Sequence, residues 1–186
     1  DPIKTGNYVN TSTAQLDKLT MMVEKLLETA TLDGEELALN KEEVNLNNLL
    51  QSLVNKHQTL AIGKKISLSQ IDDDAITNGD PFHLDNALNN LLDNAVKYGG
   101  DTIEVTLNSR NGSYSILVSD SGTSLSKAEA KQIFEKFYRV PKGNTHDVKG
   151  FGIGLYYTQK IIEKHGGSID VSVTSQTTFK IDLPNA

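Results

Sequence analysis

Four short groups of polar and glycine residues have the types and spacing of residues that could bind a ligand or take part in chemistry. The first contains Asn90, Asn94 and Lys97, which are four and three residues apart and therefore share one face of an expected helix. An amide oxygen is a hard ligand of the kind that Mg²⁺ takes alongside phosphate oxygens, and a lysine one turn later can neutralise a phosphate. The same residues also fit an amphipathic helix whose polar face is only solvated.

The second group is Asp120 with Gly122, and the third is the alternating run Gly150, Gly152 and Gly154. Asp120 ends an expected strand, where a carboxylate can accept a hydrogen bond from the exocyclic amine of adenine while a glycine lets the flat base approach the backbone. The alternating glycines precede an expected helix, whose first N–H groups are free to bind an anion. A plain turn and a glycine-rich loop without a ligand are the alternatives.

The fourth group runs from Phe134 to Arg139 and is followed by a polar stretch from Val140 to Lys149. Arg139 is suited to a bidentate contact with phosphate, and the polar stretch has the character of a lid over a ligand. An ordinary surface loop fits these residues equally well.

The apolar pattern indicates which helices position these groups. Apolar residues three and four apart from Leu16 to Ala30 predict one long helix over residues 8 to 31, with the seam of a coiled coil or helical bundle. A helix folded back on its own domain is the alternative. A second helix is expected from Leu46 to about Ile62, a third from Asp80-Pro81 to Gly99-Gly100, and a last one from Gly154 to Gly166-Gly167.

The expected strands are short and mostly alternate apolar and polar residues. Asn111-Gly112 predicts a tight hairpin between two of them. Helices that alternate with antiparallel strands predict an α+β fold, with a layer of helices against one mixed sheet. The strand ranges are 66–68, 75–77, 103–107, 114–118, 169–173 and 179–183.

Composition narrows the class of protein. The 186 residues suffice for one domain with a helical extension, and a net charge of -6 argues against a general nucleic-acid binder. The absence of cysteine excludes a disulfide framework and a thiolate zinc site. No run approaches the roughly 20 apolar residues of a membrane span, and no signal peptide opens the sequence, so we expect any membrane anchor to lie outside this chain.

In order and spacing, the four groups resemble the sequence boxes of sensor histidine kinases of two-component systems. The resemblance covers essentially the whole chain, and His165 to Ile169 and Thr177 to Phe179 also follow the family pattern. The matching segments are Asn90 to Tyr98 (N box), Asp120 to Gly122 (first glycine box), Phe134 to Arg139 (F box) and Gly150 to Leu155 (second glycine box).

The resemblance implies a member of the GHKL ATPase superfamily. Its Bergerat-type fold is a two-layer α/β sandwich, a mixed sheet against three helices, here preceded by a long N-terminal helix. Residues 1–42 are then expected to be the C-terminal part of the dimerisation and phosphoacceptor hairpin, and residues 43–186 the ATP-binding catalytic domain. None of the four histidines sits in a phosphoacceptor box. We therefore expect this chain to bind ATP but not to phosphorylate itself.

Carried over residue by residue, the resemblance implies a site for ATP and Mg²⁺. Asn94, helped by Asn90, is expected to coordinate Mg²⁺, and Asp120 to hold the adenine amine. Arg139 and Asn90 are the expected catalytic residues, with Arg139 stabilising charge on the transferring γ-phosphoryl group. The remaining nucleotide-binding residues are expected to be Lys97 and Tyr98 at phosphate and ribose, together with Gly122, Gly150, Gly152, Gly154, Leu155 and Thr178.

The resemblance also implies partners and a location. The expected partners are ATP and ADP, the phosphoacceptor helix of the full-length protein, a second copy in a homodimer, and the receiver domain of a response regulator. Nucleic acid and direct membrane contact are not expected. The expected location is the cytoplasmic side of a membrane-anchored bacterial sensor.

Two departures keep other functions open. Ser124 stands where the first glycine box usually has a second glycine, and Ser175-Gln176 where a glycine often precedes the Thr-Thr-Phe element. A degenerate nucleotide-binding or dimerisation scaffold is therefore one alternative. A GHKL switch ATPase is another, but that branch has a glutamate as the base for water where this chain has Asn90, so hydrolysis is expected to be slow.

Overall fold

The computed structural model describes residues 37–110, 112–122, 125–141 and 151–186, together with Thr13, Leu16, Thr20 and Val23. These four residues are helical, and the Thr20 hydroxyl donates to the Leu16 carbonyl at 3.1 Å. The rest of the helix expected over residues 8 to 31 lies outside the described residues. The chain divides into two compact units, Asp1–Ala38 and Leu39–Ala186. The assignment of residues 1–42 to a dimerisation hairpin stays a prediction.

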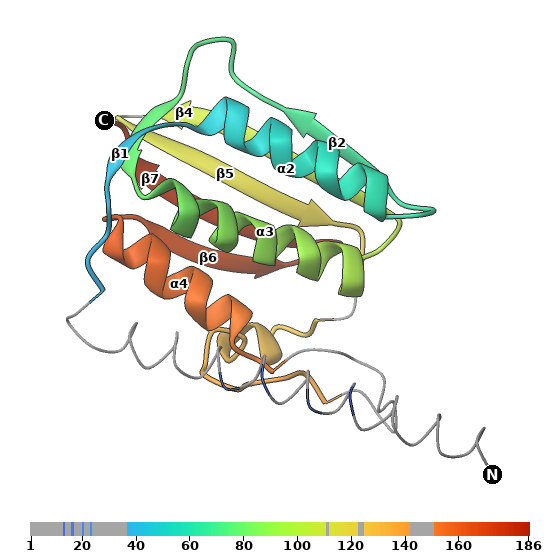
Figure 1. The fold of residues 1–186 in the computed structure, drawn as a ribbon. Helices are drawn as coiled ribbons and strands as arrows, with labels where there is room; N and C mark the ends of the chain where they lie inside the picture. Colours follow the sequence, from blue (N-terminus) through green and yellow to red (C-terminus); the bar gives the residue numbers. More distant parts are fainter. Residues whose placement is uncertain are drawn as a thin grey trace. The chain divides into compact units, whose positions relative to one another are not determined.

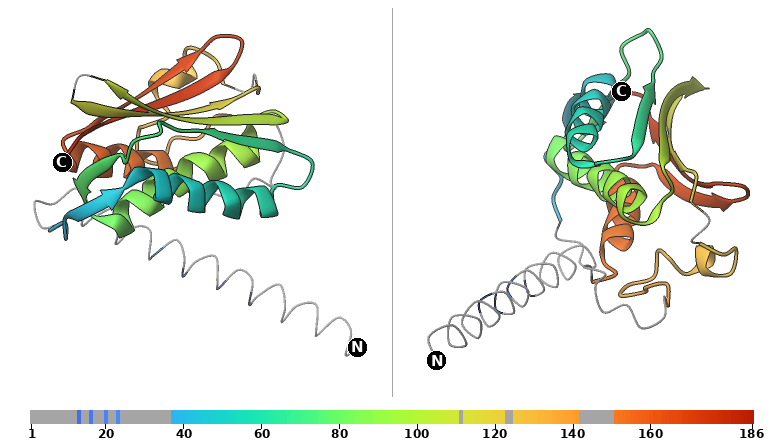
Figure 2. Two further views of the ribbon diagram at one scale, coloured as in Figure 1. Left: turned by 90° about the horizontal axis from the view of Figure 1, so that it is seen from above. Right: turned by 90° about the vertical axis from the view of Figure 1, so that its right-hand side faces the viewer.

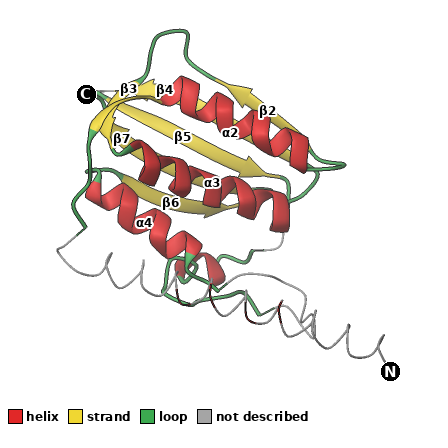
Figure 3. Cartoon of the chain, in the orientation of Figure 1, coloured by secondary structure: helices red, strands yellow, loops and turns green. Residues whose placement is uncertain are grey.

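The larger unit is a two-layer α+β sandwich, as expected. Figure 1 and Figure 2 show its helices side by side over one face of a twisted sheet, and Figure 3 shows the same layers coloured by type of element. The described elements are β1 (Glu42–Asn45), α2 (Leu46–Leu60), β2 (Lys65–Ser69), β3 (Ile76–Gly79), α3 (Pro81–Tyr98), β4 (Thr102–Arg110), β5 (Ser113–Asp120), a 3₁₀ turn (Glu129–Lys131), α4 (Gly154–Lys164), β6 (Ser168–Val173) and β7 (Thr177–Pro184).

The main sheet has the strand order β2-β4-β5-β7-β6. Strand β2 pairs parallel with β4, and the other three pairs are antiparallel, so the sheet is mixed. Strand β1, which the sequence analysis did not expect, pairs antiparallel with β3 in a separate two-stranded sheet. The long strand β5 lies in the middle of the main sheet and ends at Asp120, one of the residues expected to do chemistry.

Local signals explain why α3 begins and ends where it does. The Asp80 carboxylate accepts the His83 N–H at 3.1 Å as an N-cap, and Pro81 occupies the first turn, where its missing N–H is not needed. The helix ends at Tyr98, and the N–H of its C-cap residue Gly99 donates to the Ala95 carbonyl at 2.9 Å. Both ends are thus fixed by residues that the sequence analysis identified.

The core lies between the helices and the sheet. Leucines of α3 face the inward side chains of the central strands, and each side chain that becomes fully buried contributes roughly 1.5–3 kcal/mol of transfer free energy. The largest fully buried side chains are Leu46, Leu50, Leu53, Leu84, Leu88, Leu91, Leu92, Ile103, Leu107, Ile116, Ile161 and Ile162. This packing fixes α3, which carries the expected N box, against β5, which ends at the first glycine box. Among the described residues, no helix is long and apolar enough to cross a bilayer.

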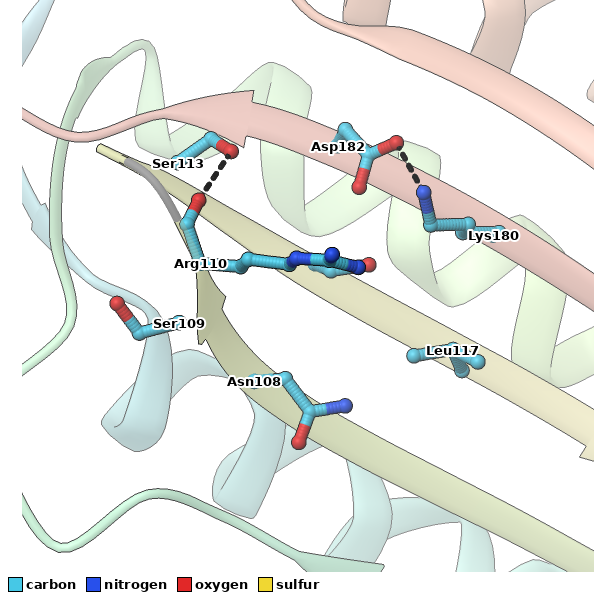
Figure 4. Close-up of a pocket in the computed structure, with 8 residues that line it drawn as sticks. Asn108, Ser109, Arg110, Ser113, Leu117, Lys180 and Asp182 are labelled. Carbon is cyan, nitrogen blue, oxygen red and sulfur yellow. Dashed lines mark hydrogen bonds and ion pairs between the residues drawn. The ribbon is translucent and has the colours of Figure 1, made fainter.

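The opposite face of the sheet is polar. It carries an open cavity of about 640 Å³, lined by Asn108, Ser109, Arg110, Ser113, Ser115, Leu117, Lys180 and Asp182. Figure 4 shows the Ser113 hydroxyl bonded to the Arg110 carbonyl and Lys180 paired with Asp182. None of the expected site residues that the structure describes lines this cavity.

Candidate functional site

Asp120 is a buried carboxylate at the C-terminal end of β5. It is 7% exposed, and its Oδ1 accepts the Gly122 N–H at 2.8 Å. Burial raises the pKa of Asp120, while hydrogen bonds from the backbone N–H groups of Gly122 and Gly100 and the positive charge of Lys64 act to lower it. A carboxylate held in this way is a fixed and strong hydrogen-bond acceptor.

Three glycines, which we call the glycine cradle (Gly99, Gly100 and Gly122), close around this carboxylate. A Cβ atom on Gly99 would lie 2.7 Å from both Cβ and Cγ of Asp120, and one on Gly122 would lie 2.7 Å from Asp120 Oδ1. A Cβ atom on Gly100 would meet the side chain and backbone of Ser121. Glycine is therefore required at these positions by close approach. The sequence analysis treated Gly99-Gly100 only as a helix stop and missed this contact.

The hydroxyl of Thr177 contacts the glycine cradle, whereas the hydroxyl of Thr178 contacts Ser119 instead. Thr177 lies directly opposite Asp120 in the β5–β7 ladder and donates to the Gly122 carbonyl at 3.4 Å. Thr178 lies opposite Ser119, and the two hydroxyls are 2.9 Å apart. Because neighbouring residues of a strand point to opposite faces, Thr178 is on the other face of the sheet from Asp120. Of these two neighbours, Thr177 therefore lies on the face of Asp120, while the role implied for Thr178 in nucleotide binding stays a prediction.

The structure brings the expected N box together with the start of α4. The Asn90 side chain on α3 donates through Nδ2 to the Gly154 carbonyl at 3.4 Å, so Oδ1 is left as an acceptor. The Thr158 hydroxyl, on the next turn of α4, lies 2.9 Å from the Gly154 carbonyl and 3.2 Å from that of Ala87. Leu155, next to Gly154, is partly buried against the hydrophobic core.

Asn94 and Lys97 follow Asn90 on the same helix. Asn94 is partly buried, and its amide has no hydrogen-bond partner within the part of the chain that the structure describes. The Lys97 ammonium is about half exposed and pairs with the Asp93 carboxylate at 3.0 Å. Tyr98, also partly buried, ends the helix immediately before the glycine cradle. The spacing that placed these polar residues on one helix is thus present in α3.

The F box is tied to the second glycine box through backbone groups. The Phe137 N–H donates to the Gly152 carbonyl at 3.0 Å. Phe137 has a φ of 66°, a rare conformation for a bulky residue, and Gly152 has a φ of 71°. A Cβ atom on Gly152 would lie 2.6 Å from the Tyr138 carbonyl oxygen, so this close approach requires glycine. Arg139 is exposed two residues after Phe137, and Gly150 lies outside the described residues.

The donor set is compatible with Mg²⁺ held largely by a ligand. In the described ranges, no group of three or more His, Cys, Asp or Glu side chains could hold a metal ion. The amide oxygens of Asn90 and Asn94 are hard acceptors, and Mg²⁺ commonly takes one or two protein oxygens while phosphates and water fill its other positions. These residues therefore fit a magnesium ion that arrives with a nucleotide.

Comparisons with known proteins identify the family to which this chain belongs. Residues 79–186 match the family model described as histidine kinase-, DNA gyrase B- and HSP90-like ATPase. The chain is 36% identical over 178 residues to the sensor protein RprX of Bacteroides fragilis, covering 90% of this chain and 34% of RprX. It is 34% identical over 173 residues to the sensor protein SrrB of Staphylococcus aureus, covering 90% of this chain and 30% of SrrB. The chain thus spans about a third of the length of these curated relatives.

Solved structures share the fold. Full-length ShkA in complex with AMPPNP superposes with a TM-score of 0.84 at 22% identity, over 97% of this chain and 38% of that chain. The nucleotide-free catalytic domain of the histidine kinase ThkA superposes with a TM-score of 0.69 at 23% identity, over 79% of this chain and 97% of that domain. The second match covers most of the larger unit, where Asp120 and Asn94 lie.

Proposed function

Because this chain belongs to the family of histidine kinase-, DNA gyrase B- and HSP90-like ATPases, we propose that residues 43–186 bind Mg-ATP and donate its γ-phosphate to a histidine of a two-component sensor kinase. Within the family, the chain is a histidine-kinase type of ATP-binding domain, and its curated relatives RprX and SrrB are sensor proteins. The acceptor histidine, the relay to a response regulator and the homodimer are parts of this proposal.

The observation that carries the proposal is the buried Asp120 carboxylate within the glycine cradle. An exocyclic amine, such as that of adenine, donates to a carboxylate, and the lack of side chains on Gly99, Gly100 and Gly122 lets a flat base approach the backbone. The Thr177 hydroxyl holds the Gly122 carbonyl and so fixes the edge of this base site. Hydrogen bonding at Asp120 is the basis for selecting adenine.

The phosphate end is assigned to α3 and the start of α4. Asn94, with Asn90 one turn earlier, would hold Mg²⁺, which when bound neutralises phosphate charge and orients the γ-phosphoryl group. Lys97 would contact a phosphate after leaving Asp93, and the N–H groups at the start of α4, near Gly154, would donate hydrogen bonds to another phosphate. Arg139 stays in the proposal as the catalytic cation, and Gly150, Gly152 and Gly154 as the glycines that shape the site near the phosphates.

The acceptor histidine is proposed to lie outside these residues. His165 is 4% exposed, with one ring nitrogen 2.8 Å from the Asp80 N–H and the other 2.7 Å from the Ile161 carbonyl. His57 is 2% exposed, and His83 is bonded to the Tyr157 hydroxyl at 2.8 Å. These three side chains serve the packing of the domain, and His146 lies outside the described residues.

Calorimetric titration with Mg²⁺ and a non-hydrolysable ATP analogue tests the binding site. We expect Mg²⁺-dependent binding by the wild type and a loss of about tenfold or more in Asp120→Asn, because an amide turned to offer its NH₂ group would meet the adenine amine. Asp182→Asn is the matched control, since Asp182 pairs with Lys180 on the opposite face of the sheet. A folded protein that binds no nucleotide would instead favour the scaffold function.

The transfer step needs the full-length parent protein. Incubation with ATP labelled at the γ-phosphate should label a histidine, with little release of free phosphate. Steady ATP hydrolysis without labelled protein would favour the switch ATPase. Asn90→Ala should lower labelling by removing one of the two proposed amide ligands of Mg²⁺, while Asn108→Ala, which changes an amide on the opposite face, should leave labelling unchanged.

A further inference from the structure

Lys64 is a cation that belongs to none of the sequence boxes and yet reaches the base site. It lies in the turn between α2 and β2, where Gly63 has a φ of 82° and the Lys64 N–H donates to the Ala61 carbonyl at 3.2 Å. From this turn, its partly buried side chain spans to the end of α3, where Nζ donates to the Gly99 carbonyl at 2.8 Å. An ammonium at the C-terminus of a helix is also favoured by the helix dipole.

The bond to Gly99 connects Lys64 to Asp120 through one peptide. The Gly99 Cα packs so closely on Asp120 that no Cβ fits between them, and the next N–H, that of Gly100, donates a hydrogen bond to the Asp120 carboxylate. Holding the Gly99 carbonyl therefore also holds the direction of the Gly100 N–H, because the two groups belong to the same planar peptide. Lys64 thus orders the backbone that binds the carboxylate.

Lys64 also acts on Asp120 through its charge. Burial raises the pKa of Asp120, and the Lys64 ammonium is the charged side chain that opposes this rise. From β4 and β7, the residues opposite Asp120 are the uncharged Ile103 and Thr177. The last turn of α3 carries Lys97, which is paired with Asp93. The nearby Asp101, before β4, and Lys65, at the start of β2, have exposed side chains.

We propose that Lys64 is a positioning residue for base recognition, which holds the Gly99–Gly100 peptide and the glycine cradle in place around the Asp120 carboxylate. The proposal rests on the proposed ATP site. An ionised carboxyl only accepts hydrogen bonds and therefore matches the 6-amino group of adenine. A protonated carboxyl can donate and therefore matches the 6-keto group of guanine. Lys64 thus lowers the pH at which ATP binding begins to weaken, and it supports the preference for adenine over guanine.

The test compares Lys64→Met and Lys64→Arg with the wild type, with Lys65→Met as the control for a neighbouring exposed lysine. Dissociation constants of Mg-AMPPNP are measured by calorimetry at about pH 8 and about pH 5. We expect Lys64→Met to bind about twofold to tenfold more weakly than the wild type at the higher pH, because the Gly99 carbonyl loses its donor. The loss should be larger at the lower pH, because burial raises the pKa of Asp120 and the opposing charge of Lys64 is gone. Lys64→Arg and Lys65→Met should follow the wild type.

Two further measurements complete the test. The affinity ratio of Mg-AMPPNP to Mg-GMPPNP should fall in Lys64→Met as the pH is lowered. A carbon-detected NMR titration of the Asp120 carboxyl, without nucleotide, should show a higher pKa in Lys64→Met than in Lys64→Arg. An equal loss of affinity at both pH values, or an unchanged Asp120 titration, would overturn the proposal. If the wild type bound no nucleotide, the proposed function would fail, while the NMR titration would still decide the effect of Lys64.

Discussion

Asp80 and His165, which are 85 positions apart, are joined by a buried hydrogen bond from the Asp80 N–H to Nε2 of His165 at 2.8 Å. The other ring nitrogen lies 2.7 Å from the Ile161 carbonyl. Because a backbone N–H only donates and a carbonyl only accepts, His165 is neutral with its proton on Nδ1. The Asp80 carboxylate accepts the N–H groups of His83 and Asn40. These hydrogen bonds therefore form one junction that holds together the start of α3, the end of α4 and the segment before β1.

Acid should destabilise the domain through this junction. Burial lowers the pKa of His165 below its ordinary 6.5, so the unfolded chain binds that proton more readily. The stability that neutral His165 contributes is present above pH 6.5 and is lost as the pH falls below it, by at most about 1.4 kcal/mol per pH unit. Urea unfolding between about pH 8 and pH 5 should show a free energy of unfolding that decreases in this range.

A variant separates His165 from other acid-sensitive groups. Glutamine at this position does not titrate, so His165→Gln should be less stable at neutral pH but should show a flatter dependence on pH below 6.5. Asp80 contributes to the pH dependence of stability at lower pH than His165 does. Burial works to raise its pKa, but the N–H groups of His83 and Asn40 and the charge of His83 lower it below 3.8. Its contribution is therefore present above pH 3.8 and lost below it. An unchanged slope in His165→Gln would assign the acid sensitivity to another group.

Gly122→Ala should impair nucleotide binding more than stability. Its Cβ would lie 2.7 Å from Asp120 Oδ1 and 2.8 Å from the Gly100 nitrogen, so the carboxylate must move. Gly112→Ala, in the turn between β4 and β5, is the control. The φ of 76° at Gly112 strains an alanine by roughly 1 kcal/mol, but the nearest atom to the added Cβ is in Asn185, 3.7 Å away. Calorimetry should show at least about tenfold weaker Mg-AMPPNP binding for Gly122→Ala and wild-type binding for Gly112→Ala.

Thr177→Val and Thr178→Val form a matched pair, because both remove a hydroxyl from adjacent positions of β7 without changing shape. Thr177 bonds to the Gly122 carbonyl on the face of Asp120, whereas Thr178 bonds to Ser119 on the other face. We expect Thr177→Val to weaken nucleotide binding by about threefold to tenfold, for the loss of one hydrogen bond, and Thr178→Val to bind as the wild type does. The reverse order of effects would place the nucleotide on the polar face of the sheet.

The sequence predicted the elements whose signals are local. Asp80-Pro81 and Gly99-Gly100 bound α3 as expected, and Gly112 of the expected hairpin lies between β4 and β5. The α+β layer arrangement followed from the order of these elements. Strand β1 was missed because Glu42 to Asn45 is short and mostly polar, and only its pairing with β3 makes it a strand.

The candidate site was predicted where a residue type carries the chemistry, as at Asp120. Its surroundings depend on contacts between distant segments, which no local pattern encodes. The choice between Thr177 and Thr178 follows from the register of β7 against β5, since a shift of one residue exchanges the two faces. The contact of Lys64 with Gly99 joins residues 35 positions apart and has no sequence signature.

Thr158→Val should destabilise the contact between α3 and α4. Thr158 is fully buried, and its single hydroxyl proton is shared between the Gly154 carbonyl at 2.9 Å and the Ala87 carbonyl at 3.2 Å. Valine keeps the shape but leaves the buried Ala87 carbonyl without this donor, so we expect a loss of roughly 1–3 kcal/mol in urea unfolding. Thr158→Ser should retain most of the stability, because the hydroxyl stays.

Thr59→Val is the matched control for this last prediction. The Thr59 hydroxyl also bonds a carbonyl one turn earlier, that of Asn55 at 3.1 Å, but on an exposed face of α2 where water can replace it. Thr59→Val should therefore change the free energy of unfolding by less than about 0.5 kcal/mol. Since Asn90 bonds the same Gly154 carbonyl as Thr158, Thr158→Val should also weaken Mg²⁺-dependent nucleotide binding. Equal effects of the two valine variants would mean that backbone packing alone holds Gly154 beside Asn90.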